Sequence, residues 1–257
     1  MKNLTKYFIL FGFIINGFNP LNAQENSNFF NKNIDYQVKG QISIGGVTPL
    51  SIPAQIRKIE KYDPKLQLGI GLNATKWLDN RKKFGIRLGV NYESRGMNTQ
   101  AKVKNYYTQI ADDTGAQTTG YFTGHVVTDV KNTYITVPVL FVWNVNNRWN
   151  LYGGFFVSSL INKSFTGYIY DGDFREGTPI GELTTFENTA RGLYDFSDDL
   201  GKFQWGNQIG GEYKITNYLS VFADVTMANN QAFKGNFEAI SFKMYNLFGN
   251  FGVGFNF

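Results

Sequence analysis

Apolar and polar residues alternate in stretches of about ten residues that recur along the chain. In residues 66–76, leucine, isoleucine and alanine hold the even positions up to 74, while glutamine, glycine, asparagine and threonine hold the odd ones. A period of two over this length is typical of a tilted strand that crosses a membrane. The same pattern, with varying clarity, predicts eight strands: residues 34–44, 66–76, 84–93, 134–145, 149–159, 205–215, 219–227 and 245–257.

The connections between these strands alternate between short and long. The short ones carry the Asp and Asn residues that tight turns favour. Barrels of the outer membrane have short periplasmic turns and long external loops. We therefore expect an all-β fold, an eight-stranded antiparallel up-and-down transmembrane β-barrel with long external loops. The short connections are residues 79–82, 146–148 and 216–217, and the long ones are 46–64, 97–130, 172–203 and 229–241.

The first long loop carries a short helical pattern. Ile52, Ile56 and Ile59 recur at intervals of three or four residues, and Pro53 stands near the start. We expect this segment to cap the mouth of the barrel or to rest at the membrane interface.

The polar face of the predicted strands identifies the interior. A soluble barrel such as a lipocalin buries apolar residues inside, and that alternative has to place six charges in an apolar core. A membrane barrel pairs such charges in its lumen, and eight strands leave an interior that side chains just fill. We expect structural salt bridges there, with an ion path as the alternative. The predicted lumen network is Lys39, Arg87, Glu93, Glu212, Lys214 and Asp224.

The two ends of the chain carry targeting features. Lys2 and Lys6 precede an apolar run over residues 7–15, and Leu21-Asn22-Ala23 offers a cleavage site, which together predict a secretory signal peptide. An N-terminal anchor helix is the alternative, but nine apolar residues fall short of the roughly 20 that a spanning helix needs. The expected organisation is a leader at 1–23, a short segment at 24–33 and a barrel at 34–257.

The C-terminal strand ends in Phe257, after alternating apolar residues. This ending resembles the signal by which the outer-membrane assembly machinery recognises its clients; the alternative is the last strand of a soluble β-domain. Four aromatic residues lie near the short turns and are expected to form an interfacial girdle: Trp77, Trp143, Trp149 and Tyr218.

Composition limits the chemistry of the chain. It has no Cys, which excludes disulfides, thiol catalysis and thiolate metal sites. Without residues 1–23, 23 basic residues face 20 acidic ones, and a net charge of +3 is too weak to suggest nucleic-acid binding. The only histidine, His125, lies in a polar loop with no nucleophile elbow, so we expect no catalytic residue.

The long loops hold the remaining candidates. The acids of the third loop could bind Ca²⁺, but they lack EF-hand spacing, and solvated loop charge is the favoured interpretation. Aromatic residues of the second loop form either a sugar- or peptide-binding surface or strand extensions above the membrane. The candidate contact surface is Tyr106, Tyr107, Tyr121, Phe122, Asp171 and Asp173.

Several passages resemble the PorT-like outer-membrane β-barrel proteins of Gram-negative bacteria. No single passage is diagnostic, although together they span nearly the whole chain after the leader. The resemblance implies an outer-membrane barrel and no particular activity. The passages are residues 49–53, 56–59, 120–124, 134–138, 170–172, 195–198 and 244–246.

These features predict an integral outer-membrane protein that is not an enzyme and is structural or binds through its external loops. The alternative is a small porin-like transporter, or a subunit of a secretion or nutrient-uptake complex. The expected partners are outer-membrane lipid, the assembly machinery and a surface ligand or envelope complex, with no nucleic acid. No cofactor and no metal are expected.

Overall fold

The computed structural model describes residues 33–111, 117–187 and 190–257. The proposed leader lies outside these residues. One antiparallel sheet contains twelve strands. The strands are β1 (Ile34–Thr48), β2 (Ile56–Asp63), β3 (Gln67–Trp77), β4 (Phe84–Ala111), β5 (Gln117–Asn144), β6 (Trp149–Asn162), β7 (Phe165–Glu176), β8 (Leu183–Phe186), β9 (Gly192–Asp195), β10 (Phe203–Lys214), β11 (Leu219–Ala228) and β12 (Tyr245–Asn256), with a short 3₁₀ turn, η1 (Ser197–Asp199).

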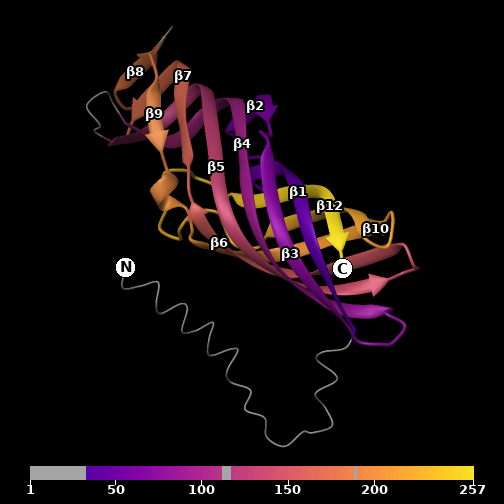
Figure 1. Cartoon of the computed structure of the whole chain (residues 1–257). Helices are drawn as coiled ribbons and strands as arrows, with labels where there is room; N and C mark the ends of the chain where they lie inside the picture. Colours follow the sequence, from indigo (N-terminus) through magenta and orange to yellow (C-terminus); the bar gives the residue numbers. More distant parts are fainter. Residues whose placement is uncertain (1–32, 112–116, 188–189) are drawn as a thin grey trace, which may run out of the picture.

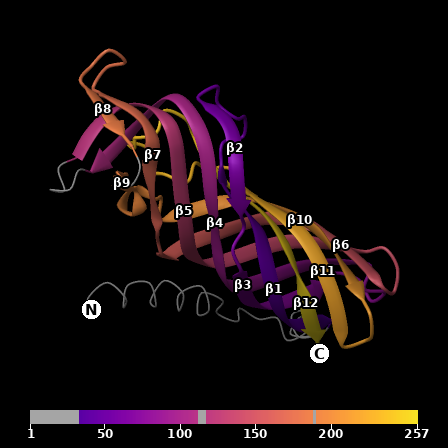
Figure 2. The ribbon, with the colours of Figure 1, turned by 90° about the horizontal axis from the view of Figure 1, so that it is seen from above.

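The pairings of eight of these strands run in a closed cycle. Their order is β1, β3, β4, β5, β6, β10, β11 and β12, and β12 pairs in turn with β1. The first and last strands of the chain are therefore neighbours (Figures 1 and 2). We call these eight the ring strands. Each of the eight predicted segments lies on one of them.

The prediction of eight strands in total is wrong, because four more strands lie between the predicted ones. β2 extends along β4, β7 along β5, and β8 and β9 along β7. β4 and β5 also continue far beyond their predicted ends and pair from Phe84↔Trp143 to Ala111↔Gln117. Long ladders thus replace most of the expected loop at 97–130 (Figure 1).

The two faces of the ring strands differ sharply in exposure. On β3, Ile70 is 67% exposed, whereas Gln67 on the other face is 3% exposed. Apolar side chains that point outward form a continuous belt, as expected of strands in lipid. The belt includes Val38, Ile42, Leu68, Leu72, Ile86, Leu88, Val90, Val137, Val139, Phe155, Val157, Ile209, Val221, Val225, Phe251 and Val253.

The part of the molecule away from the short turns has a conventional apolar core. We call it the distal module: β2, β7, β8, β9, β4 beyond residue 96, β5 before residue 131, and the connection 229–244. Phe165 packs edge-on against Phe233, with ring centroids 4.9 Å apart, and Phe233 stacks on Phe237. Side chains of the connection 229–244 thus share one apolar core with side chains of β4, β5 and β7.

The structure corrects two details of the expected wall. The helical pattern at 52–59 is wrong, because residues from Ile56 onward form β2. Trp77 was expected in the interfacial girdle on the periplasmic side but is only 2% exposed and points inward, where its indole Nε1 donates to Asp35. Trp143, Trp149 and Tyr218 do face outward. Among the described residues, no helix is long and apolar enough to span a membrane.

Candidate functional site

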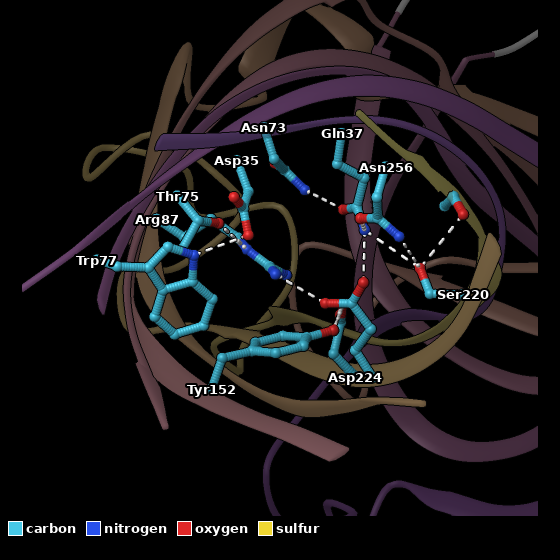
Figure 3. Close-up of polar contacts among 12 residues, drawn as sticks. Asp35, Gln37, Asn73, Thr75, Trp77, Arg87, Tyr152, Ser220, Asp224 and Asn256 are labelled. Atoms are coloured by element: carbon cyan, nitrogen blue, oxygen red, sulfur yellow. Dashed lines mark hydrogen bonds and ion pairs between the residues drawn. The ribbon is translucent and has the colours of Figure 1, made fainter. Parts of the chain in front are cut away.

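The inner face of the ring strands carries a connected set of polar side chains. Arg87 on β4 donates from Nη2 to Oε2 of Glu212 on β10 at 2.7 Å, and from Nε to Oγ1 of Thr75 at 3.0 Å. Gln37 on β1 donates to the other oxygen of Glu212 at 2.5 Å. Figure 3 shows Arg87, Thr75 and Gln37 pointing into the same interior space from different strands. These contacts join strands on opposite sides of the ring.

A second set of contacts continues the network. Tyr152 donates to Oδ2 of Asp224 at 3.0 Å (Figure 3). Asn250 donates to Oδ1 of the same carboxylate at 2.7 Å. The Arg87 guanidinium lies 5.3 Å from the centre of the Tyr152 ring, which links the two sets. Lys39 lies 5.1 Å from the ring of Phe222, and its charge interacts with Asp224.

Glycine makes room for this packing. A Cβ on Gly254 would lie 2.5 Å from Nε2 of Gln37 and 2.8 Å from Oγ of Ser220. The Ser220 hydroxyl donates to the Gly254 carbonyl at 3.2 Å. A side chain at 254 would therefore displace groups that bind Glu212, so the interior is packed to its limit here.

A third cluster centres on Arg95, which is 2% exposed. Its Nη2 donates to Oε1 of Glu93 at 2.8 Å. Three rings surround the guanidinium, with centroids 5.3–5.7 Å away: Tyr134, Phe156 and Phe248. A desolvated guanidinium gains about 2 kcal/mol or more from such a ring face. The carboxylate and the rings together offset part of the free-energy cost of removing Arg95 from water, while its buried Nε has no hydrogen-bond partner.

The buried charges balance. Among the described residues, three buried cations and three buried carboxylates lie on this inner face, so their formal charges cancel. Each carboxylate has hydrogen-bond donors, which is the condition for a buried charge to be tolerated. The arrangement suits structural packing better than a cation- or anion-selective path. The six residues are Lys39, Arg87, Arg95, Glu93, Glu212 and Asp224.

Five of the six residues of the predicted lumen network therefore lie together inside. Lys214 does not, since it lies half-buried at the end of β10 beside a short turn. Sequence reasoning missed Arg95 because it ended the alternating segment at Glu93. The same odd-numbered pattern, continued by two residues, identifies Arg95 as inward-facing.

The structure divides the predicted loop surface between the two faces of the sheet. Tyr106 and Phe122 point inward and are buried in the core of the distal module. Tyr107 and Tyr121 lie half-buried on the opposite face, with ring centroids 5.3 Å apart. The four residues occupy extensions of β4 and β5, so they do not form one contact surface.

The two acids of that surface lie on β7, which pairs with β5 so that Asp173 stands opposite Thr123. Asp171 is exposed and has a positive φ of 44°. Asp173 accepts a hydrogen bond from Thr185 of β8 at 2.9 Å. No group of three or more His, Asp or Glu side chains in the described part of the chain could hold a metal ion.

His125 contacts residues of β2 and β7. Its Nδ1 lies 2.8 Å from Oε2 of Glu60 on β2, and its ring lies 5.3 Å from that of Tyr170 on β7. Neither contact supplies a nucleophile, so the geometry gives no support to hydrolytic chemistry at this residue. Phe257 faces outward, and its backbone exchanges hydrogen bonds with Tyr36.

A cavity of about 330 Å³ lies above the polar interior, inside the distal module. Side chains of β1, β2, β4 and β5 surround it, together with the connection before β12. Burial within this module raises the pKa of Tyr106, which lines the cavity. Burial and the neighbouring Tyr106 likewise raise the pKa of Tyr194. Both hydroxyls therefore stay protonated at neutral pH.

Residues 22–234 match the family model described as outer membrane protein beta-barrel domain. A search of curated proteins gives no match. Solved structures similar to this chain include the Neisserial surface protein A (11% identity, TM-score 0.37, covering 88% of this chain and 98% of that one) and the attachment invasion locus protein Ail of Yersinia pestis (12%, 0.36, 87% and 97%). The outer membrane protease OmpT of Escherichia coli is also similar (12%, 0.38, 91% and 100%). The absence of enzymatic activity stays a prediction.

Proposed function

This chain belongs to the outer membrane protein beta-barrel domain family, and we propose that it is a non-conducting membrane anchor that presents a binding module at the cell surface. The family indicates a location in the outer membrane of a Gram-negative bacterium. In this proposal the eight ring strands form the closed barrel that crosses the membrane. The distal module lies outside the cell, since the long connections of such barrels are external.

The filled interior is the observation that carries this proposal. Eight strands leave a lumen that side chains just fill, and here Arg87, Glu212 and Gln37 bridge it from strands on different sides. The charges inside cancel, and their hydrogen bonds connect strand to strand. Such an interior holds the barrel rigid and leaves binding to the distal module.

The ends of the chain complete the proposal. We take residues 1–23 as a cleaved leader that directs export. Phe257, directly after the last strand, faces outward, and in this proposal the assembly machinery recognises it during insertion. The belt contacts outer-membrane lipid, and the distal module contacts a ligand or an envelope partner.

Conductance across a planar lipid bilayer tests the non-conducting interior. We expect no large stable conductance from the purified protein. The triple variant Arg87→Ala, Tyr152→Ala and Glu212→Ala removes bridging side chains and should raise the conductance. Leu88→Ala with Val90→Ala alters neighbouring positions on the outward face and should leave it unchanged. A large stable conductance from the unmodified protein would overturn the proposal.

Transport is the second candidate function, and one observation favours it. Polar side chains recur on the inner lining, among apolar ones, from Asp35 near the short turns to Asn246 near the distal module, whereas a purely structural core needs no such continuity. A small transporter would show conductance, and a subunit of a secretion or uptake complex would co-purify with partners from intact membranes. If neither occurs, this candidate fails.

A further inference from the structure

The wall of the molecule has a seam between β1 and β2. β1 pairs with β3 from Ile34↔Lys76 only as far as Ser43↔Gln67. Above that level β1 pairs with β12 up to Thr48↔Tyr245, while β2 pairs with β4. At this level β1 and β2 therefore do not pair with each other. The Tyr62 hydroxyl bridges the seam by donating to the Gly45 carbonyl at 2.9 Å.

The cavity of about 330 Å³ lies directly behind this seam. Its lining includes both borders, Gly45 to Pro49 on one side and Ile56, Ile59 and Tyr62 on the other. Its volume falls at the lower end of the roughly 300–1,000 Å³ range of small-molecule sites. The inner wall of the cavity includes Met97, Val103, Tyr106, Val126, Phe165, Ile240 and Met244.

The lining is suited to hydrocarbon. The polar groups deep in the cavity already bind each other, since the Tyr194 hydroxyl lies 2.7 Å from Oγ1 of Thr128 and donates to the Val127 carbonyl at 2.8 Å. The Tyr62 hydroxyl is bonded to Gly45. The remaining surface is built from aliphatic, methionine and aromatic side chains, which favour an apolar occupant.

The lower end of the seam meets the apolar belt. Ile44 on β1 is 46% exposed, and Leu66, just before β3, is 76% exposed. Leu247 on β12 is exposed on the belt and also lines the cavity. An apolar path therefore leads from the lipid-facing surface through the seam to the cavity, with no charged side chain among the lining residues.

We propose that the seam admits one acyl chain of a membrane lipid into this cavity. This inference rests on the proposed function, which gives the distal module a binding role. It adds the chemical class of the ligand. An acyl chain is thin enough to enter between β1 and β2, which do not pair with each other, while the lipid headgroup stays at the membrane surface. The surrounding bilayer supplies such chains next to Leu66 and Leu247.

Photo-crosslinking tests the proposal in the intact protein. The full-length chain is placed in phosphatidylglycerol vesicles that contain a lipid with a diazirine at the end of one acyl chain, and crosslinked residues are mapped by mass spectrometry. We expect labels on Met97, Val103 or Val126 in addition to belt residues. Ala101→Phe, which reduces the cavity, should lower cavity labelling at least about fivefold, whereas Ala223→Phe on the belt should leave it unchanged.

Two further measurements keep the test decisive. Tyr62→Phe removes only the hydroxyl that bridges the seam, so it should speed cavity labelling even if Ala101→Phe fails to fold. A diazirine fatty acid added to the protein in detergent distinguishes a free acid from a bilayer lipid. Labels confined to the belt in both arms, or cavity labels from the free acid alone, would overturn the proposal. None of these labelling measurements depends on conductance. A failure of this proposal can therefore be distinguished from a failure of the proposed function.

Discussion

The ring and the distal module use the same two long strands with opposite polarity. In the ring part of β4, Leu88 and Val90 point outward and Arg87 points inward. In the distal part, Val103 points inward and Lys102 points outward. The inner face changes from charged to apolar between Arg95 and Met97, although the ladder with β5 continues. The backbone is the same in both regions, so the change of surroundings from lipid to water decides which side chains stabilise each face.

Because the inner face of the ring is charged and buried, we expect substitution of Arg95, which is ion-paired with Glu93, to lower the free energy of unfolding most. Arg95→Ala leaves Glu93 buried with no cation at 2.8 Å and removes the group that three rings surround. We expect a loss of about 3–5 kcal/mol in the free energy of unfolding, as for other broken buried pairs. Urea unfolding in lipid vesicles measures it.

Two controls show whether the charge itself is responsible. The double variant Glu93→Gln with Arg95→Met removes both charges and should lose less than Arg95→Ala. Lys65→Ala breaks a half-exposed pair with Asp129 and should cost about 0–1 kcal/mol. Equal losses in all three variants would contradict the contrast between interior and surface.

In the distal module the sensitive point is an aromatic side chain. Phe233→Ala removes a buried ring that contacts Phe165 and Phe237, and truncation of a core Phe costs about 3–5 kcal/mol. We expect the loss to remain local, because residue 233 lies in a connection and not in the ring. Limited proteolysis should cut the module faster while the heat-modifiable gel mobility of the barrel stays unchanged.

Ile180→Ala is the matched control for this variant, since Ile180 is 90% exposed. It should change neither readout. If Phe233→Ala abolishes heat-modifiability as well, the module and the ring unfold as one unit and the comparison between them fails.

The smallest expected effect depends on pH. Burial raises the pKa of Tyr106 and Tyr194, so the folded module holds these protons more tightly than the unfolded chain. Their contribution to stability is complete below the ordinary tyrosine pKa of about 10 and is lost progressively as the pH rises above it. Proteolysis of the module should therefore accelerate above about pH 10.

Tyr194→Phe removes one of the two titrating groups and should weaken this dependence. At neutral pH the variant loses about 1 kcal/mol, because the hydroxyl binds Thr128 and Val127. Tyr218→Phe alters an exposed tyrosine and should behave like the unmodified protein. An unchanged alkaline response in Tyr194→Phe would contradict the role of burial.

The distal strands escaped prediction for specific reasons. In β2, register shifts fall between Ile56 and Lys58 and between Ile59 and Lys61. Each shift adds a residue, so the residues that line the cavity, Ile56, Ile59 and Tyr62, recur every three positions and imitate a helix. In β4, a further shift between Val103 and Tyr106 moves the inward face from odd to even positions. The alternation of apolar and polar residues changes phase at each such shift, so it does not predict the strand beyond the shift.

The sequence by itself determined the eight ring strands, the outward direction of their apolar residues and most of the charged inner face. It could do so because lipid on one side and a filled interior on the other impose a strict period of two. Only the tertiary structure decided that Arg95 lies among three rings, that Tyr106 and Tyr107 face opposite ways and that a cavity lies behind a seam. These features depend on bulges and on contacts between residues far apart in the chain, which a local pattern does not contain.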